Sequence, residues 1–278
     1  MNKIRKCLFP VAGYGTRFLP ATKAIPKEML PIGNKPLIQY AVEEALSCNI
    51  SDMVIVTSKF KGAIRAHFEP NHEIEASVRG SEKEKLLYTL NKIIDACKFS
   101  YIEQPEMLGL GHAIHCGNQL IGDESFAVML PDDLCHNEGD SVLKQMKEIY
   151  EKNPDCCVVA IEEVPTEEVN KYGVIDGELV SGSTKIYQVK SMVEKPDPVE
   201  APTNLAIIGR YILTPEIFEV LKDISPDKNG EIQITDALTM LAKQGKVLAY
   251  KFQGIRFDCG NTKGFLRASN EITYEDEC

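Results

Sequence analysis

Basic side chains and prolines crowd a loop near the start of the chain, where phosphate could be held. The stretch 11–31 reads VAGYGTRFLPATKAIPKEMLP and places Gly13 and Gly15 ahead of Arg17, Lys23 and Lys27. Lysine and arginine side chains and the backbone N–H groups of a glycine-containing turn all bind phosphate oxygens. Prolines fix φ and stiffen a loop, so the sequence predicts a preorganised anion site.

Neither of the two common phosphate-loop patterns fits this stretch. The Walker pattern GxxxxGK[ST] and the dinucleotide pattern GxGxxG both need a glycine at position 18, where the chain has Phe18. The acidic residue that a dinucleotide site needs after its second strand is also missing. These mismatches disfavour an NAD-type site, while a plain strand-to-loop turn with solvated lysines stays open.

Histidine and cysteine side chains form a second group that could do chemistry. His112, His115 and Cys116 lie close together, and Cys135 and His136 follow. Their spacings match none of the known zinc patterns, so the sequence disfavours structural zinc.

Composition limits the class of protein. The chain has 278 residues and a net charge of −10, from 31 Lys and Arg against 41 Asp and Glu. An acidic chain is a poor general binder of nucleic acid, because that affinity depends on basic patches. No apolar run is long enough to span a membrane, and the first one stops at Pro10, which argues against a signal peptide. Nine Cys without a CxxC pair indicate reduced thiols, so we expect a cytoplasmic protein.

The elements that must position the loop alternate between strand and helix in the first half. Apolar runs predict strands at 7–11, 53–57, 99–103, 126–130 and 156–161, and helical periodicity predicts helices at 37–46, 61–68, 82–97, 113–120 and 142–151. This alternation predicts an open, largely parallel sheet with helices on both faces. Ligands of such sheets bind at the carboxyl ends of the strands.

The second half has a different pattern. Strands are expected at 172–175, 185–193 and 205–213 without helices between them, which indicates a mixed sheet or an inserted β-rich region. Helices follow at 215–222 and 235–243, then a strand at 247–252 and a closing helix after 263. Thr235 and Asp236 are expected to cap the helix that they begin.

Several motifs in a fixed order resemble the nucleoside-diphosphate-sugar pyrophosphorylases. Besides the loop, they are QP at 104–105 with GLGHA at 109–113, LPDD at 130–133, YGV at 172–174, VEKP at 193–196, NGEIQITD at 229–236 and FDCG at 257–260. The longer form ATKAIPKEMLP is similar to the bacterial UTP:glucose-1-phosphate uridylyltransferases. The resemblance runs from the first strand to about residue 264, which is nearly the whole chain.

The resemblance implies a fold and a division of the chain. The fold is α/β and Rossmann-like, with a predominantly parallel central mixed sheet, helices on both faces and a smaller β-rich sugar-binding lobe. Residues 1–278 would form one nucleotidyltransferase domain, with a nucleotide-binding half at about 1–163, a sugar-phosphate-binding half at about 164–264, and a C-terminal helix and tail at 265–278.

The implied reaction joins UTP and glucose 1-phosphate to give UDP-glucose and pyrophosphate, with Mg²⁺ as cofactor. Arg17, Lys27 and Lys195 would be catalytic. UTP would contact Ala12, Gly13, Gly15, Thr16, Glu28, Gln104 and Gly109. The sugar phosphate would contact Gly173, Glu194, Lys195 and Asn204. Asp132 and Asp258 would bind the metal, with Asp133 as the less favoured ligand, because each follows an apolar run that could end at one sheet edge.

Other functions stay open at this point. A thymidylyl- or cytidylyltransferase, a retaining glycosyltransferase, and a non-catalytic regulatory homologue that binds nucleotide sugar would share much of this pattern. Glycosyltransferases usually show an Asp-x-Asp motif, whereas Asp132 and Asp133 are adjacent. The resemblance also implies a homodimer or homotetramer, with no nucleic acid and no membrane as partners.

Overall fold

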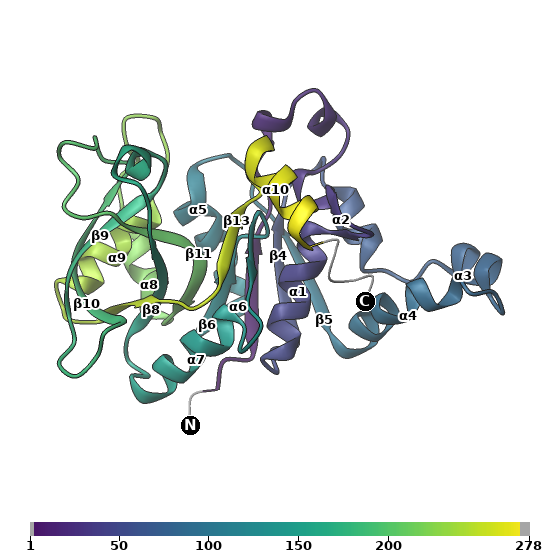
Figure 1. The fold of residues 1–278 in the computed structure, drawn as a ribbon, viewed down its shortest axis with the longest axis horizontal. Helices are drawn as coiled ribbons and strands as arrows, with labels where there is room; N and C mark the ends of the chain where they lie inside the picture. Colours follow the sequence, from purple (N-terminus) through teal and green to yellow (C-terminus); the bar gives the residue numbers. More distant parts are fainter. Residues whose placement is uncertain (1–2, 273–278) are drawn as a thin grey trace.

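One nine-stranded sheet runs through the molecule, and helices pack on both of its faces (Figure 1). The computed structural model describes residues 3–272. The acidic tail 273–278 lies outside the described residues.

The strands and helices have the following bounds. The strands are β1 (Lys6–Pro10), β2 (Pro31–Ile32), β3 (Lys35–Pro36), β4 (Asp52–Thr57), β5 (Lys98–Glu103), β6 (Phe126–Met129), β7 (Asp133–His136), β8 (Cys157–Glu163), β9 (Gly173–Leu179), β10 (Ile186–Glu194), β11 (Leu205–Leu213), β12 (Val247–Lys251) and β13 (Ile255–Asp258). The α-helices are α1 (Leu37–Ser47), α2 (Gly62–His67), α3 (His72–Val78), α4 (Glu84–Ala96), α5 (Gly109–Cys116), α6 (Asn118–Ile121), α7 (Val142–Lys152), α8 (Glu216–Asp223), α9 (Ile234–Ala242) and α10 (Thr262–Ile272).

The first half of the chain forms the parallel part of the sheet. The strand order is β5-β4-β1-β6-β11-β8-β12-β10-β9, and β5, β4, β1 and β6 all run in one direction. Their runs of Val, Ile, Leu and Phe are buried on both sides, as expected for parallel strands covered by helices. The carboxyl ends of β1, β4, β5 and β6 therefore share one edge, as the sequence predicted.

The second half makes the sheet mixed. Strand β11 pairs antiparallel with β6 and with β8, whereas β8 and β12 are parallel to each other. Strand β10 is antiparallel to both β12 and β9. The β-rich second half predicted from the sequence is thus continuous with the parallel half in one sheet.

Two hydrophobic cores lie on opposite faces of the sheet. Side chains of α5, α8 and α9, such as Ile114, Phe218 and Leu238, pack on one face. Side chains of α1 and α7, such as Val42 and Met146, pack on the other. Since successive side chains of a strand point to opposite faces, neighbours such as Leu8 and Phe9 of β1 belong to different cores. The prediction of helices on both faces is confirmed.

A short ribbon of β7 and β13 extends from this frame, and the sequence did not predict it. The two strands pair antiparallel and place Asp258 opposite Asp133. A separate core that includes Leu134, Phe257 and Ala268 of α10 holds the ribbon in place. Asp258 therefore reaches the site at the end of this ribbon, and not at the end of a strand of the central sheet as expected.

Some boundaries also differ from the sequence prediction. The helix expected at 113–120 begins at Gly109 and is divided at Gly117, where a Cβ would collide with the side chain of Leu8. Helix α3 was not predicted. Thr235 does not cap α9, because the cap position is Gln233 and the Thr235 hydroxyl contacts Glu194. Within residues 3–272, no helix combines the length and apolar character needed to cross a bilayer.

A buried ion pair joins α1 to the centre of the sheet. Arg210 of β11 is 1% exposed and lies 2.8 Å from Glu44, whose side chain is 9% exposed. Arg210 also donates to the carbonyl oxygens of Leu130 and Gly209, and Glu44 accepts from the N–H of Leu143. The pair therefore ties together α1, α7 and the residues that follow β6.

We expect Arg210→Met to lower the free energy of unfolding by about 3–5 kcal/mol, because Glu44 would remain as an uncompensated buried charge. The combined Arg210→Met, Glu44→Gln variant should regain part of that loss, since the glutamine amide is neutral and can still accept from Leu143. Urea unfolding followed by circular dichroism measures both. Equal destabilisation of the single and the combined variant would contradict this view of the pair.

Candidate active site

A cavity of about 710 Å³ opens where the loop after β1, the end of β6, the β7–β13 ribbon and strands β9 to β11 meet. The residues that line it and that the sequence singled out are Arg17, Asp132, Asp133, Gly173, Glu194, Lys195, Thr235 and Asp258. Tyr172 and Arg256 line it as well. The fold thus brings together segments that are more than 200 residues apart in the sequence.

Asp132 and Asp258 face one point in this cavity. A Cβ on Gly260 would lie 2.9 Å from Oδ2 of Asp132 and 3.0 Å from Oδ1 of Asp258, with Nη1 of Arg17 3.5 Å away. The backbone N–H of Gly260 donates to Oδ1 of Asp258. A side chain at position 260 would displace at least one of the two carboxylates, so glycine allows them to lie close together.

A cation already neutralises one of these carboxylates. Nζ of Lys27 lies 2.6 Å from Oδ2 of Asp132. Burial raises the pKa of Asp132, but the charge of Lys27 and its hydrogen bond outweigh burial, so the pKa is lowered overall. The pKa of Asp258 is raised instead, because burial and the charge of Asp133 both disfavour its ionised form.

The donor set fits Mg²⁺. In residues 3–272, no group of three or more His, Cys, Asp or Glu side chains is arranged to hold a metal ion, so the protein would supply only the two aspartates. Mg²⁺ commonly binds through one or two carboxylates and completes its shell with water and substrate phosphates. The Lys27 ammonium shows that this point attracts positive charge.

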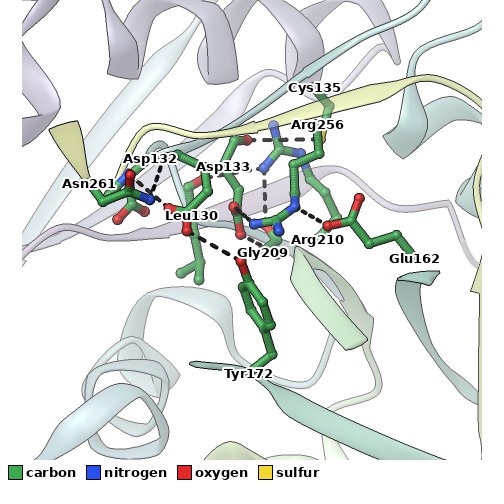
Figure 2. Close-up of polar contacts among 12 residues, drawn as sticks. Leu130, Asp132, Asp133, Cys135, Glu162, Tyr172, Gly209, Arg210, Arg256 and Asn261 are labelled. Carbon is green, nitrogen blue, oxygen red and sulfur yellow. Dashed lines mark hydrogen bonds and ion pairs between the residues drawn. The ribbon is translucent and has the colours of Figure 1, made fainter. Parts of the chain in front are cut away.

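Asp133 binds different groups of the protein from those bound by the adjacent Asp132. Figure 2 shows Arg256 between Asp133 and Glu162. Nη1 of Arg256 lies 2.6 Å from Oδ1 of Asp133, and its Nε lies 2.6 Å from Oε1 of Glu162. Oδ2 of Asp133 accepts the N–H of Gly209 at 2.7 Å. Both oxygens of Asp133 are therefore occupied within the protein, which agrees with the preference for Asp132 as the ligand.

Tyr172 links this ion-pair network to the second aspartate. Its ring lies under the Arg256 guanidinium at 4.9 Å, and its hydroxyl donates to Oδ2 of Asp258 at 3.5 Å. Neither Arg256 nor Glu162 was identified from the sequence. No local signal marks them, because Glu162 of β8 and Arg256 of β13 are far apart in the sequence and meet only in the folded structure.

The opposite wall carries Lys195, Glu194 and Gly173. Lys195 has a φ of +46°, which is unusual for a residue with a side chain, and its Nζ lies 3.2 Å from Oε1 of Glu194. Oε2 of Glu194 accepts from the Thr235 hydroxyl. A Cβ on Gly173 would lie 2.7 Å from Cγ2 of Thr235, so the closeness of β9 to α9 requires glycine. The positive φ of Lys195 is a form of backbone strain that is common at functional sites.

The loop after β1 folds into short 3₁₀ turns at Thr16–Phe18, Ala21–Lys23 and Lys27–Met29. Ala12 is buried, whereas Gly13 is exposed and a Cβ there would meet nothing within 4 Å. Gly15 has a φ of +65°. A Cβ built on Gly15 would lie 3.1 Å from the Cβ of Lys27. The turns therefore bring Lys27 back beside Gly15.

Glu28 lies beneath this loop. Its side chain is 1% exposed and 2.6 Å from Nζ of Lys61, which was not identified from the sequence. Oε1 of Glu28 is buried without a hydrogen-bond partner within residues 3–272. In this arrangement Glu28 neutralises Lys61 under the loop, and its contact with UTP stays a prediction.

The remaining predicted residues lie outside the cavity lining. Gln104 follows β5 at the same sheet edge, and its amide donates to the carbonyl oxygen of Gly109 at 3.2 Å, so these two are brought together. Asn204 is exposed and donates to the carbonyl oxygen of Val164. It does not line the cavity, and its contact with the sugar stays a prediction.

We expect Gly260→Ala to weaken divalent metal binding about 10- to 100-fold, a loss typical of disturbed metal surroundings, because the added methyl would push Asp132 and Asp258 apart. Titration with Mn²⁺, followed by the electron paramagnetic resonance signal of the free ion, measures this. Gly139→Ala is the control, since Gly139 is exposed and a Cβ there meets only Asn137 at 3.5 Å. Unchanged binding in Gly260→Ala would place the metal elsewhere.

Comparison with known proteins agrees with this geometry. Residues 10–275 match the sequence model of the Nucleotidyl transferase family. The UTP--glucose-1-phosphate uridylyltransferase of Pseudomonas aeruginosa is 60% identical over 274 residues, which are 98% of this chain and 97% of that protein. The enzyme of the same name from Bacillus subtilis is 46% identical, over 100% of this chain and 94% of that protein.

Solved structures give the same result. The chain is similar to an apo UDP-glucose pyrophosphorylase, with a TM-score of 0.94, 55% identity, and coverage of 99% of this chain and 100% of that one. A UDP-glucose pyrophosphorylase complexed with UDP-glucose matches with a TM-score of 0.90, 53% identity and the same coverage. Since the family model covers nearly the whole chain and the relatives align from end to end, this chain belongs to the nucleotidyl transferase family.

Proposed function

We propose that this protein transfers the uridylyl group of UTP to glucose 1-phosphate and releases pyrophosphate. The observation that carries the proposal is the cavity into which the fold gathers Arg17, Asp132, Lys195 and Asp258. Relatives that align over nearly the whole chain bear the name of this activity.

The reaction needs charge control more than proton transfer. The attacking oxygen belongs to a phosphate whose second pKa is about 6, so it is already ionised at neutral pH. It attacks the α-phosphorus of UTP in line with the departing pyrophosphate, and no covalent intermediate is needed. The main obstacle is the approach of one anion to another, so catalysis requires positioning and electrostatic stabilisation.

Arg17 and Lys27 would act at the triphosphate. Both come from the loop after β1, together with the N–H groups around Gly13, Gly15 and Thr16 that would bind phosphate oxygens. Burial lowers the pKa of Lys27, but Asp132 more than compensates, so its pKa is raised and it stays charged. When bound by Asp132 and Asp258, Mg²⁺ would neutralise charge on the reacting phosphates.

Lys195 and Glu194 would hold the sugar phosphate on the opposite wall. The Lys195 ammonium would bind the phosphate, and Glu194, kept in place by Thr235, would accept hydrogen bonds from glucose hydroxyls. Gly173, which lines the cavity, would let the sugar lie against the backbone of β9. Uracil would lie on Ala12 and Gly13, with Gln104 and Gly109 at its edge.

The homodimer or homotetramer implied by the resemblance and the cytoplasmic location expected from the cysteines stay predictions. Size-exclusion chromatography with light scattering would measure the oligomeric state.

With Mg²⁺ and glucose 1-phosphate present, we expect pyrophosphate release to be fastest with UTP among the four ribonucleoside triphosphates and dTTP. A coupled pyrophosphate assay with each nucleotide separately measures this. No release with UTP, or faster release with dTTP or CTP, would rule out the uridylyltransferase. Omission of Mg²⁺ should abolish turnover.

We expect Lys195→Ala and Asp258→Asn to lower kcat/KM by about 10²–10³, a range typical of lost transition-state stabilisation. Lys190→Ala and Asp140→Asn are the matched controls, because both side chains are exposed and pair with other exposed side chains. Thermal melting followed by circular dichroism checks that all four variants fold. Near-normal turnover in either site variant would show that the site is misplaced.

A further inference from the structure

The side-chain amide of Gln104 is held by two acceptors on one side. Its Nε2 lies 3.2 Å from the carbonyl oxygen of Gly109 and 3.0 Å from Nδ1 of His112. Gln104 is 6% exposed and follows the last residue of β5, where its backbone N–H donates to Thr57. An NH₂ group has two hydrogens, so these two contacts can use both.

His112 can accept from Gln104 only when its Nδ1 carries no proton. Its other nitrogen, Nε2, lies 3.7 Å from Sγ of Cys116 on the next turn of α5 and can direct its hydrogen there. A proton on Nδ1 would instead be donated to the carbonyl oxygen of Glu106, 3.1 Å away, and would turn the Gln104 amide around. The neutral Nε2–H form satisfies both the Gln104 amide and the Cys116 thiol, whereas the Nδ1–H form satisfies only the carbonyl oxygen of Glu106.

The amide oxygen of Gln104 is left for a ligand. No donor in residues 3–272 forms a hydrogen bond to Oε1, and this atom is not among the buried oxygens that lack a partner, so it reaches solvent. The side chain therefore presents an acceptor, while its donors face inward.

We propose that His112 is a positioning residue that fixes the Gln104 amide and thereby makes the site prefer uracil over cytosine. This inference rests on the proposed function, in which Gln104 contacts the base. Uracil and thymine carry a hydrogen at N3, which Oε1 can accept, whereas N3 of cytosine is itself an acceptor and would face Oε1 without a proton between them. Sites that hydrogen-bond a substrate group discriminate strongly against a substrate that cannot form that bond.

His112→Phe removes both nitrogens and keeps a flat ring, so the Gln104 amide keeps only the carbonyl of Gly109 and can turn its NH₂ group toward the base. His112→Asn restores an acceptor close to the position of Nδ1. His115→Phe is the matched control, because His115 lies on the same helix and makes no contact with Gln104. The kcat/KM of each variant is measured with UTP, dTTP and CTP.

We expect His112→Phe to lower the UTP:CTP ratio of kcat/KM about five- to tenfold, the value of one hydrogen bond, and to leave the UTP:dTTP ratio unchanged, since thymine has the same N3–H. His112→Asn should return the UTP:CTP ratio to within about threefold of the parent, and His115→Phe should not change it. Binding of UDP and CDP by calorimetry gives the same comparison without turnover.

An unchanged UTP:CTP ratio in His112→Phe would overturn the proposal. So would an equal fall in His115→Phe, or a loss with UTP, dTTP and CTP alike, because each would mean that His112 only supports the helix. If His112→Phe does not fold, His112→Leu replaces it in the same comparison. Failure of the proposed function is distinguishable, because the unchanged protein would then not use UTP at all.

Discussion

The ion pair between Arg256 and Asp133 is the contact on which the geometry of the site depends. It holds the β7–β13 ribbon in the register that places Asp258 opposite Asp133, one residue from Asp132. Arg256 also binds Glu162 of β8 and so anchors the ribbon to the central sheet. Its side chain is 6% exposed. Removing one partner of such a buried ion pair destabilises a protein strongly, because the other charge is left buried and unpaired. With the Lys27 ammonium on Asp132, the two carboxylates can therefore stay close together before any metal ion binds them.

Opposite charges form ion pairs at this cavity. Lys27 lies on Asp132, whereas Lys195 is paired with Glu194 on the far wall. In the proposed function, the carboxylates that hold these ammonium groups would also bind the metal ion and a sugar hydroxyl. Residues after β1 and β6 line the cavity together with residues of strands β9 to β11, and β11 is antiparallel to β6.

Most strands and helices of the central sheet could be predicted from the sequence, because runs of apolar residues indicate buried segments. The strand–helix alternation up to β8, the mixed second half and the cover of helices on both faces were all predicted correctly. Strands β7 and β13 were missed because four residues that include charged side chains carry no strand signal. Helix α5 was placed too late, since glycines at its start concealed it. Thr235 was taken for a cap, although its hydroxyl is used by Glu194 across the cavity.

The sequence by itself determined the residue types of the site, because its motifs occur in a fixed order and carry the basic, acidic and glycine positions that phosphate chemistry requires. Only the tertiary structure decided which of the two adjacent aspartates faces Asp258. Asp133 is occupied by Arg256 and Gly209, whereas Asp132 faces Asp258 across Gly260. It also decided the partners of Gln104 and Glu28, which are His112 and Lys61. The physical reason is that strand pairing brings distant residues into contact, and local spacing contains no record of that pairing.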